Sequence, residues 1–160
     1  MKKLLSLAAL CTAFVAAPAA AQMYVGAGAG TIKTNADKST AWKLYGGYQF
    51  NPIWGAEFAY NDLGKYFGSN VVSWSLAGTA TMPIGERWSV LGKLGVTSNR
   101  ARFTGAGSRS DLLVGAGIGY KLTSNVGLRL EYEDFGKLSN VATVNNSRGR
   151  TLGMSVKYSF

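Results

Sequence analysis

From residue 23 to the end of the chain, bulky apolar residues alternate with small or polar ones. The last segment shows this most clearly, because every second position is bulky: Leu152, Met154, Val156, Tyr158 and Phe160. The positions between them hold Thr151, Gly153, Ser155, Lys157 and Ser159. A period of two is typical of β-strands, whose successive side chains point to opposite faces. No helical periodicity of useful length interrupts it, so the pattern predicts an all-β protein.

The alternation divides into eight predicted strands, with these approximate spans: 23–31, 40–50, 53–61, 71–82, 88–97, 110–122, 126–133 and 150–160. Short connections rich in turn formers, at 51–52, 83–87 and 123–125, alternate with longer polar ones, at 32–39, 62–70, 98–109 and 134–149. Outer-membrane barrels have this asymmetry of short turns and long loops. We therefore predict an eight-stranded antiparallel up-and-down transmembrane β-barrel over residues 22–160, with both termini on the short-turn, periplasmic side.

The first residues have the composition of a secretory signal peptide. Lys2 and Lys3 precede an apolar run at 4–15, and small residues follow at 19–21. The run is shorter than the roughly 20 apolar residues that a membrane-spanning helix needs, so we expect a signal peptide at 1–21, cleaved after Ala21. Cys11, the sole cysteine, lies inside this segment, and bulky Leu10 beside it argues against a lipoprotein anchor. The mature chain then contains no thiol.

Alternation alone does not say which face meets lipid, because a soluble lipocalin-like barrel has the opposite sense. The non-bulky face is too poor in charge for a solvated surface, as in the predicted strands 71–82 and 110–122. Small residues there suit the narrow interior of an eight-stranded barrel. Aromatic residues also gather near both ends of the predicted strands, as in the girdles at the two headgroup levels. We therefore expect the apolar face to point outward, into lipid.

The inward face of this barrel carries isolated charges of both signs. Burial in a narrow interior requires such charges to pair with one another. The predicted charge network of the interior consists of Lys43, Glu57, Lys93, Lys121, Arg129, Glu131, Glu133 and Lys157.

Several kinds of chemistry are not expected. The chain has no histidine, and histidine is the usual general base or acid of outer-membrane hydrolases. Without histidine or a mature cysteine we expect no catalytic activity, no transition-metal site and no cofactor. Glu131 and Glu133 have the spacing of an acid/base pair, but Arg129 on the same strand face favours a structural ion network. Glycine runs at 26–30 and 115–119 lack the following helix of a nucleotide site, so we expect them to make room inside the barrel.

The chain is basic, with 17 Lys and Arg against 8 Asp and Glu and a net charge of +9. Many of the cations fall in the predicted long loops, where lipopolysaccharide phosphates would attract them. Generic solvated loop charge is the other interpretation of this excess. Our candidate lipopolysaccharide contacts are Lys33, Lys38, Lys65, Arg100, Arg102, Arg109, Lys137 and Arg148.

Several segments together resemble the OmpA-like transmembrane domain family of small outer-membrane barrels. They are Tyr24-Val25-Gly26-Ala27, GAEFAYNDLGK at 55–65, LRLEYEDFGK at 128–137, and the terminal Tyr158-Ser159-Phe160. The resemblance implies the same eight-stranded fold over the mature chain. It also implies that Tyr158 and Phe160 form the signal read by the barrel-assembly machinery. Ser155 stands where that signal often has glycine, so the match is incomplete.

Our leading hypothesis is a non-catalytic protein of structure and surface interaction, serving envelope integrity, lipopolysaccharide contact and adhesion. Its expected partners are outer-membrane lipid, lipopolysaccharide, the barrel-assembly machinery and external or host molecules, but not nucleic acid. The main alternative is a narrow channel for ions or small solutes along the inner charges. A third hypothesis is a soluble periplasmic ligand carrier with a barrel fold.

Overall fold

The computed structural model of this chain describes residues 22–33, 38–66, 69–101, 108–137 and 148–160. They form one closed barrel of eight antiparallel strands in chain order. The strands are β1 (Gln22–Lys33), β2 (Lys38–Gln49), β3 (Trp54–Tyr66), β4 (Ser69–Ile84), β5 (Trp88–Ala101), β6 (Ser108–Lys121), β7 (Val126–Lys137) and β8 (Arg148–Ser159). The barrel closes where β1 pairs with β8 from Tyr24–Ser159 to Lys33–Arg150. The predicted fold is confirmed.

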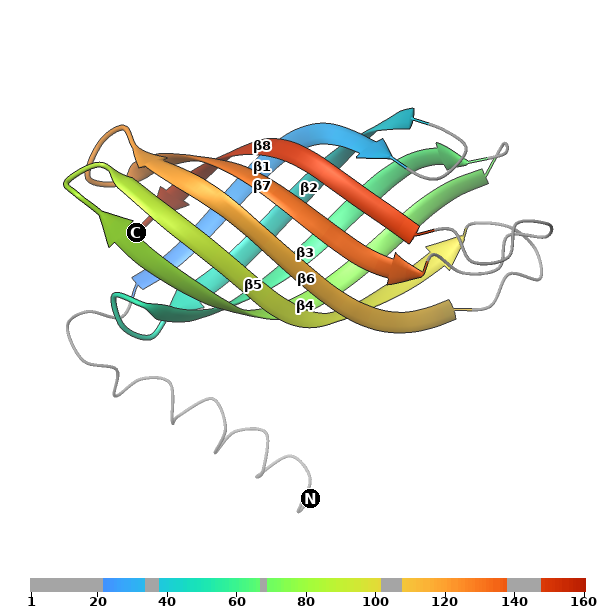
Figure 1. The fold of residues 1–160 in the computed structure, drawn as a ribbon, viewed down its shortest axis with the longest axis horizontal. Coiled ribbons are helices and arrows are strands. Elements are labelled where there is room, and N and C mark those ends of the chain that lie inside the picture. The colour runs from blue at the N-terminus through green and yellow to red at the C-terminus, as the bar shows by residue number, and fades with distance from the viewer. Residues whose placement is uncertain (1–21, 34–37, 67–68, 102–107, 138–147) are drawn as a thin grey trace, which may run out of the picture.

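Three short connections, 50–53, 85–87 and 122–125, lie at one end of the barrel, together with the start of β1 and the C-terminus (Figure 1). We call this the turn end, and the opposite end, where β1 stops at Lys33 and β8 begins at Arg148, the far end. Side chains fix the turns locally. The Asn51 carboxamide oxygen accepts hydrogen bonds from the backbone N–H groups of Ile53 at 2.9 Å and Trp54 at 2.8 Å. Such a side-chain bond stabilises chain reversal in place of a backbone bond.

Bulky apolar side chains point outward from the barrel. Along β5, Lys93 and Thr97 are 5% and 1% exposed, whereas Leu94 and Val96 are 60% and 58% exposed. This is the reverse of a soluble barrel, whose apolar side chains face inward. Within the described part of the chain, no helix is long and apolar enough to cross a bilayer.

Aromatic rings gather on the outer surface at two levels. At the turn end they contact one another in pairs: Tyr48–Phe50, Trp88–Tyr120 and Tyr158–Phe160, with ring centroids 5.4, 4.8 and 5.2 Å apart. A second group covers β2, β3 and β4, where Tyr60 lies between Trp42 and Trp74 with centroids 5.3 and 4.7 Å away. This second group lies well inside the strands, because the strands continue beyond it toward the far end.

The strands are longer at the far end than the sequence predicted. We expected loops at 62–70 and 134–149, but β3 continues to Tyr66, β4 begins at Ser69 and β7 continues to Lys137. The prediction was too short because strict alternation stops there. The pairing register shifts between Asp62 and Lys65 in β3 and between Asp134 and Lys137 in β7. A β-bulge of this kind inserts a residue without ending the strand.

Both bulges have the same local sequence, Asp-apolar-Gly-Lys. In β3, Asp62 Oδ1 accepts a hydrogen bond from the N–H of Gly64 at 3.0 Å, and in β7, Asp134 Oδ1 accepts one from Gly136 at 2.9 Å. The two glycines have φ values of 78° and 67°. This left-handed region is accessible to glycine at little steric cost. Because β3 and β7 are four strands apart in an eight-stranded barrel, the two bulges face each other across it.

Candidate functional site

A cluster of six charged side chains fills the middle of the barrel. We call it the six-charge cluster, and its members come from β2, β3, β5 and β7: Lys43, Glu57, Lys93, Arg129, Glu131 and Glu133. It contains three cations and three carboxylates, so its formal charge is zero. None of its ion pairs joins neighbouring strands, and the Arg129–Glu57 pair joins strands on opposite sides of the barrel.

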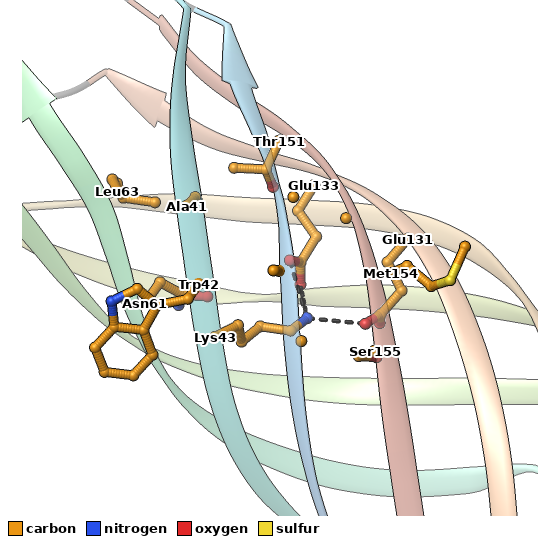
Figure 2. Close-up of a pocket in the computed structure, with 14 residues that line it drawn as sticks. Ala41, Trp42, Lys43, Asn61, Leu63, Glu131, Glu133, Thr151, Met154 and Ser155 are labelled. Carbon is orange, nitrogen blue, oxygen red and sulfur yellow. Dashed lines mark hydrogen bonds and ion pairs between the residues drawn. The ribbon is translucent and has the colours of Figure 1, made fainter.

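Lys93 holds the centre of the cluster. Its ammonium lies 2.6 Å from Glu57 Oε1, 2.8 Å from Glu131 Oε1 and 3.0 Å from Glu133 Oε1. Lys43 also pairs with the two β7 carboxylates. Its ammonium lies 2.8 Å from Glu131 Oε2 and 3.0 Å from Glu133 Oε2. Figure 2 shows the Lys43 ammonium directed at both carboxylates. Glu131 and Glu133 thus share two lysines.

Arg129 and two tyrosines cover the turn-end side of the cluster. Arg129 Nη1 lies 2.8 Å from Glu57 Oε2, and the Tyr24 hydroxyl donates a hydrogen bond to the same oxygen at 3.2 Å. The guanidinium also lies 5.0 Å from the ring centroid of Tyr24 and 5.4 Å from that of Tyr45. Cation–π contacts of this kind are strongest where water is excluded. These tyrosines were not among the predicted interior residues, although both lie at inward positions of the alternation.

Glycines give the charged side chains their space. Gly115 of β6 lies between β5 and β7, and a Cβ placed there would be 3.2 Å from Glu133 Cγ and 3.4 Å from Lys93 Cβ. A Cβ on Gly26 of β1 would overlap the Tyr45 ring. The glycine runs therefore make room for side chains that reach across the interior, as predicted.

Toward the far end, a group of buried apolar side chains adjoins the six-charge cluster, together with the buried polar side chains of Asn61, Ser73 and Asn99. Its members, which we call the apolar plug, are Ile32, Ala41, Leu63, Val71, Ala77, Leu113 and Phe135. Ile32, Leu63 and Phe135 are fully buried, at 0% exposure. They lie one or two residues past the predicted ends of their strands, where the alternation no longer indicates an inward position. Between plug and cluster, a cavity of about 30 Å³ borders Lys43 and Leu63. Its volume suits about one or two water molecules.

Lys121 and Lys157, which we predicted as members of the inner network, stay outside it. Lys157 is half-buried near the turn end, with its ammonium 5.0 Å from the Tyr24 ring centroid, and Lys121 is exposed at the last position of β6. Neither forms an ion pair with another described residue. Both lie toward the turn end of the barrel, where Lys121 is exposed and Lys157 keeps part of its side chain buried.

The register places basic residues side by side at the far end. Across β2, β1 and β8, the Cα of Lys33 pairs with those of Lys38 and Arg150. Across β7 and β8, Lys137 pairs with Arg148. We call these five residues on four adjacent strands the basic rim. Lys33 and Arg148 are exposed, and Arg150 forms a half-exposed ion pair with Asp134 at 3.2 Å.

For the other predicted lipopolysaccharide contacts, the structure describes either the backbone alone or nothing. Lys65 belongs to β3, Arg100 to β5 and Arg109 to β6, but their side chains, like those of Lys38 and Lys137, lie outside the described residues. Arg102 and the predicted signal peptide at 1–21 also lie outside them.

The C-terminal residues close the barrel at the turn end. The N–H of Phe160 donates a hydrogen bond to the Met23 carbonyl at 3.0 Å, and Gln22 Nε2 donates one to the Phe160 oxygen at 2.8 Å. Tyr158 and Phe160 point outward and are 46% and 67% exposed. Their role as an assembly signal stays a prediction. Among the residues that the structure describes, no group of three histidine, cysteine or acidic side chains is arranged to hold a metal ion.

Solved structures similar to this chain include small outer-membrane barrels. Neisserial surface protein A has a TM-score of 0.61 at 21% identity, over 86% of this chain and 97% of its own. Ail of Yersinia pestis, in complex with the heparin analogue sucrose octasulfate, has a TM-score of 0.58 at 20% identity. The match covers 88% of this chain and 97% of Ail. OprG of Pseudomonas aeruginosa has a TM-score of 0.60 at 14% identity, and the match covers 89% of this chain and 96% of OprG. No curated protein sequence matched the chain.

At such identities the solved structures establish a shared fold and no more. The family comparison reaches further, because the outer membrane protein beta-barrel domain matches residues 4–160. The closed eight-stranded barrel and its outward apolar face agree with this match. The chain therefore belongs to the outer membrane protein beta-barrel domain family.

Proposed function

We propose that this protein is a non-catalytic structural barrel of the outer membrane, whose basic rim contacts the phosphates of lipopolysaccharide. In this arrangement the turn end and both termini face the periplasm and the far end faces outward. The assignment follows the rule that outer-membrane barrels keep their short turns on the periplasmic side.

One observation carries the proposal: the register gathers Lys33, Lys38, Lys137, Arg148 and Arg150 on four adjacent strands. Paired Cα atoms on neighbouring antiparallel strands are about 5 Å apart. Cations on neighbouring backbone positions repel one another unless anions lie between them, and within the rim Arg150 has Asp134 as such a partner at 3.2 Å. Each Lys or Arg near an anionic membrane surface contributes on the order of 1 kcal/mol to binding. Ail, which shares this fold, has been solved with a polysulfated sugar.

The interior argues against the conduit hypothesis. A channel needs a continuous aqueous path, but the apolar plug and the six-charge cluster occupy successive layers of the barrel. The cavity that lies between plug and cluster, of about 30 Å³, suits one or two water molecules rather than a continuous path. We therefore assign the inner charges to holding the barrel walls together rather than to passing a solute.

The test compares two variants of equal charge change. The mature barrel, folded into zwitterionic nanodiscs with or without lipopolysaccharide, is unfolded by heat. Preferential binding to the native state raises its stability with ligand concentration. Lys33→Gln/Arg150→Gln is expected to lose most of the lipopolysaccharide-dependent rise in Tm. Lys121→Gln/Lys157→Gln, which removes two charges at the turn end, is expected to keep it. Equal rises in both variants would contradict the proposal.

A further inference from the structure

The turn end contains an open vestibule that the proposed function does not use. Its volume is about 380 Å³, and it lies between the three short turns and the inner side chains of Tyr24 and Arg129. Ligand pockets for small molecules begin at about 300 Å³. The vestibule therefore has room for a small solute, while the six-charge cluster closes its inner wall.

Positive charge dominates the lining. The charged residues are Lys121, Lys157, Arg129, Arg87 and Glu86. Arg129 is already balanced by Glu57 at 2.8 Å, within a cluster whose formal charge is zero. Lys121 and Lys157 have no carboxylate partner among the described residues, so their two charges are surplus.

Both lysines line the vestibule, and a ring contact positions one of them. Lys157 is half-buried, and its ammonium is held 5.0 Å from the Tyr24 ring centroid. Lys121 lies near the mouth, where Tyr120 beside it accepts a hydrogen bond from Arg87 at 3.4 Å. Gln49, which also lines the vestibule, has a buried side-chain nitrogen with no hydrogen-bond partner among the described atoms.

We propose that this vestibule binds a small polyvalent anion, such as a phosphate- or carboxylate-bearing solute, through Lys121 and Lys157. A cleft with one sign of charge and low-dielectric walls concentrates the field and attracts counter-ions. A half-buried cation without a partner is unfavourable, and a bound anion offsets that loss. The Gln49 amide supplies a donor at the edge of the same space. This inference is independent of the function proposed for the basic rim.

The test uses inorganic pyrophosphate as the probe. The ¹⁵N-labelled barrel in zwitterionic nanodiscs is titrated at constant ionic strength, and backbone amide shifts are followed by NMR. Shifts are expected at the vestibule, at Gly119, Gly127 and Ser159. Lys121→Gln/Lys157→Gln should weaken the apparent affinity at least tenfold, whereas Lys33→Gln/Arg150→Gln, with the same charge change at the far end, should leave it unaltered.

A conservative variant separates charge from folding. Lys157→Arg keeps the cation and is expected to retain binding, and the dispersion of the amide spectrum shows whether each variant is folded. The proposal is overturned if pyrophosphate acts no differently from chloride at equal ionic strength. It is also overturned if the shifts are confined to the far end, or if the folded double variant binds as tightly as the parent.

Discussion

Arg129 of β7 and Glu57 of β3 lie four strands apart around an eight-stranded barrel, and their ion pair of 2.8 Å joins opposite walls. A pair in this position contributes nothing until the barrel has closed. Once formed, it is shielded from water, since Glu57 is 2% and Arg129 7% exposed. Lys93 is shielded from water in the same way, at 5% exposure, and links β5 to both β3 and β7. The cluster therefore couples closure of the wall to packing of the interior.

Removing the charge of Glu57 should destabilise the barrel strongly. Glu57→Gln keeps the shape of the side chain but leaves buried Arg129 without its carboxylate partner, while Lys93 keeps Glu131 and Glu133. Breaking a buried pair in this way costs about 3–5 kcal/mol. Urea unfolding of the barrel in vesicles measures the change. Asp134→Asn breaks the half-exposed pair with Arg150 and should cost less than about 1 kcal/mol. Similar losses for both variants would contradict a structural role for the cluster.

Two adjacent glycines of β2 should respond in opposite ways to alanine. A Cβ on inward Gly47 would overlap the Tyr24 ring and lie 2.6 Å from the Ala56 carbonyl oxygen, whereas outward Gly46 has its nearest neighbour, the Tyr24 carbonyl, at 3.7 Å. Gly47→Ala is expected to lose about 1–3 kcal/mol through overpacking. Gly46→Ala should gain about 0.5–1 kcal/mol by restricting the unfolded chain. Unfolding free energies measured in the same vesicles decide; equal effects would refute the inward placement of Tyr24.

The bulge of β3 should depend on glycine more than the turn between β4 and β5 does. Gly64 and Gly85 have φ values of 78° and 80°, so alanine is strained by about 1–2 kcal/mol at either position. A Cβ on Gly85 meets nothing within 4 Å, but one on Gly64 would lie 2.7 Å from the Thr40 carbonyl oxygen. Gly64→Ala should therefore be the more destabilising in denaturant titration. If Gly85→Ala proved the worse, the close approach of β2 to the bulge would be wrong.

The lipid-facing surface can be probed by depth. Leu94 and Ile84 are both 60% exposed, but Leu94 lies in the middle of β5 and Ile84 at the turn end of β4. An outward arginine costs about 2–4 kcal/mol at the bilayer midplane and about 0–1 near the interface. Leu94→Arg should therefore be far more destabilising than Ile84→Arg when folding is measured in vesicles. Equal, small effects would mean that water rather than acyl chains covers this face.

The closed interior predicts electrical silence. In planar bilayers the wild-type barrel is expected to show no steady open level. Phe135→Ala thins the apolar plug but leaves the six-charge cluster intact below it, so this variant should stay silent too. The heat-modifiable shift of the unboiled protein on a gel confirms that each sample is folded. A steady conductance from folded wild-type protein would restore the conduit hypothesis.

The sequence by itself determined the number of strands, their order and the face that meets lipid. These features are local, because alternation between bulky and small residues is imposed on each strand separately by lipid on one side and a cramped interior on the other. The inward positions of Lys43, Glu57, Lys93 and the β7 charges follow from the same parity. The signal peptide and the assembly role of Phe160 stay predictions.

Only the tertiary structure decided which inward groups meet. Contacts across the interior depend on the register at which β1 closes on β8, and no stretch of sequence encodes that register alone. The register brings Arg129 to Glu57 and places the Lys157 ammonium against the Tyr24 ring near the turn end. It also showed that Leu63 and Phe135 are fully buried toward the far end, because the bulges carry their strands past the point where alternation fails. Charged side chains pair where they are buried, and the interior is buried only after the barrel has closed.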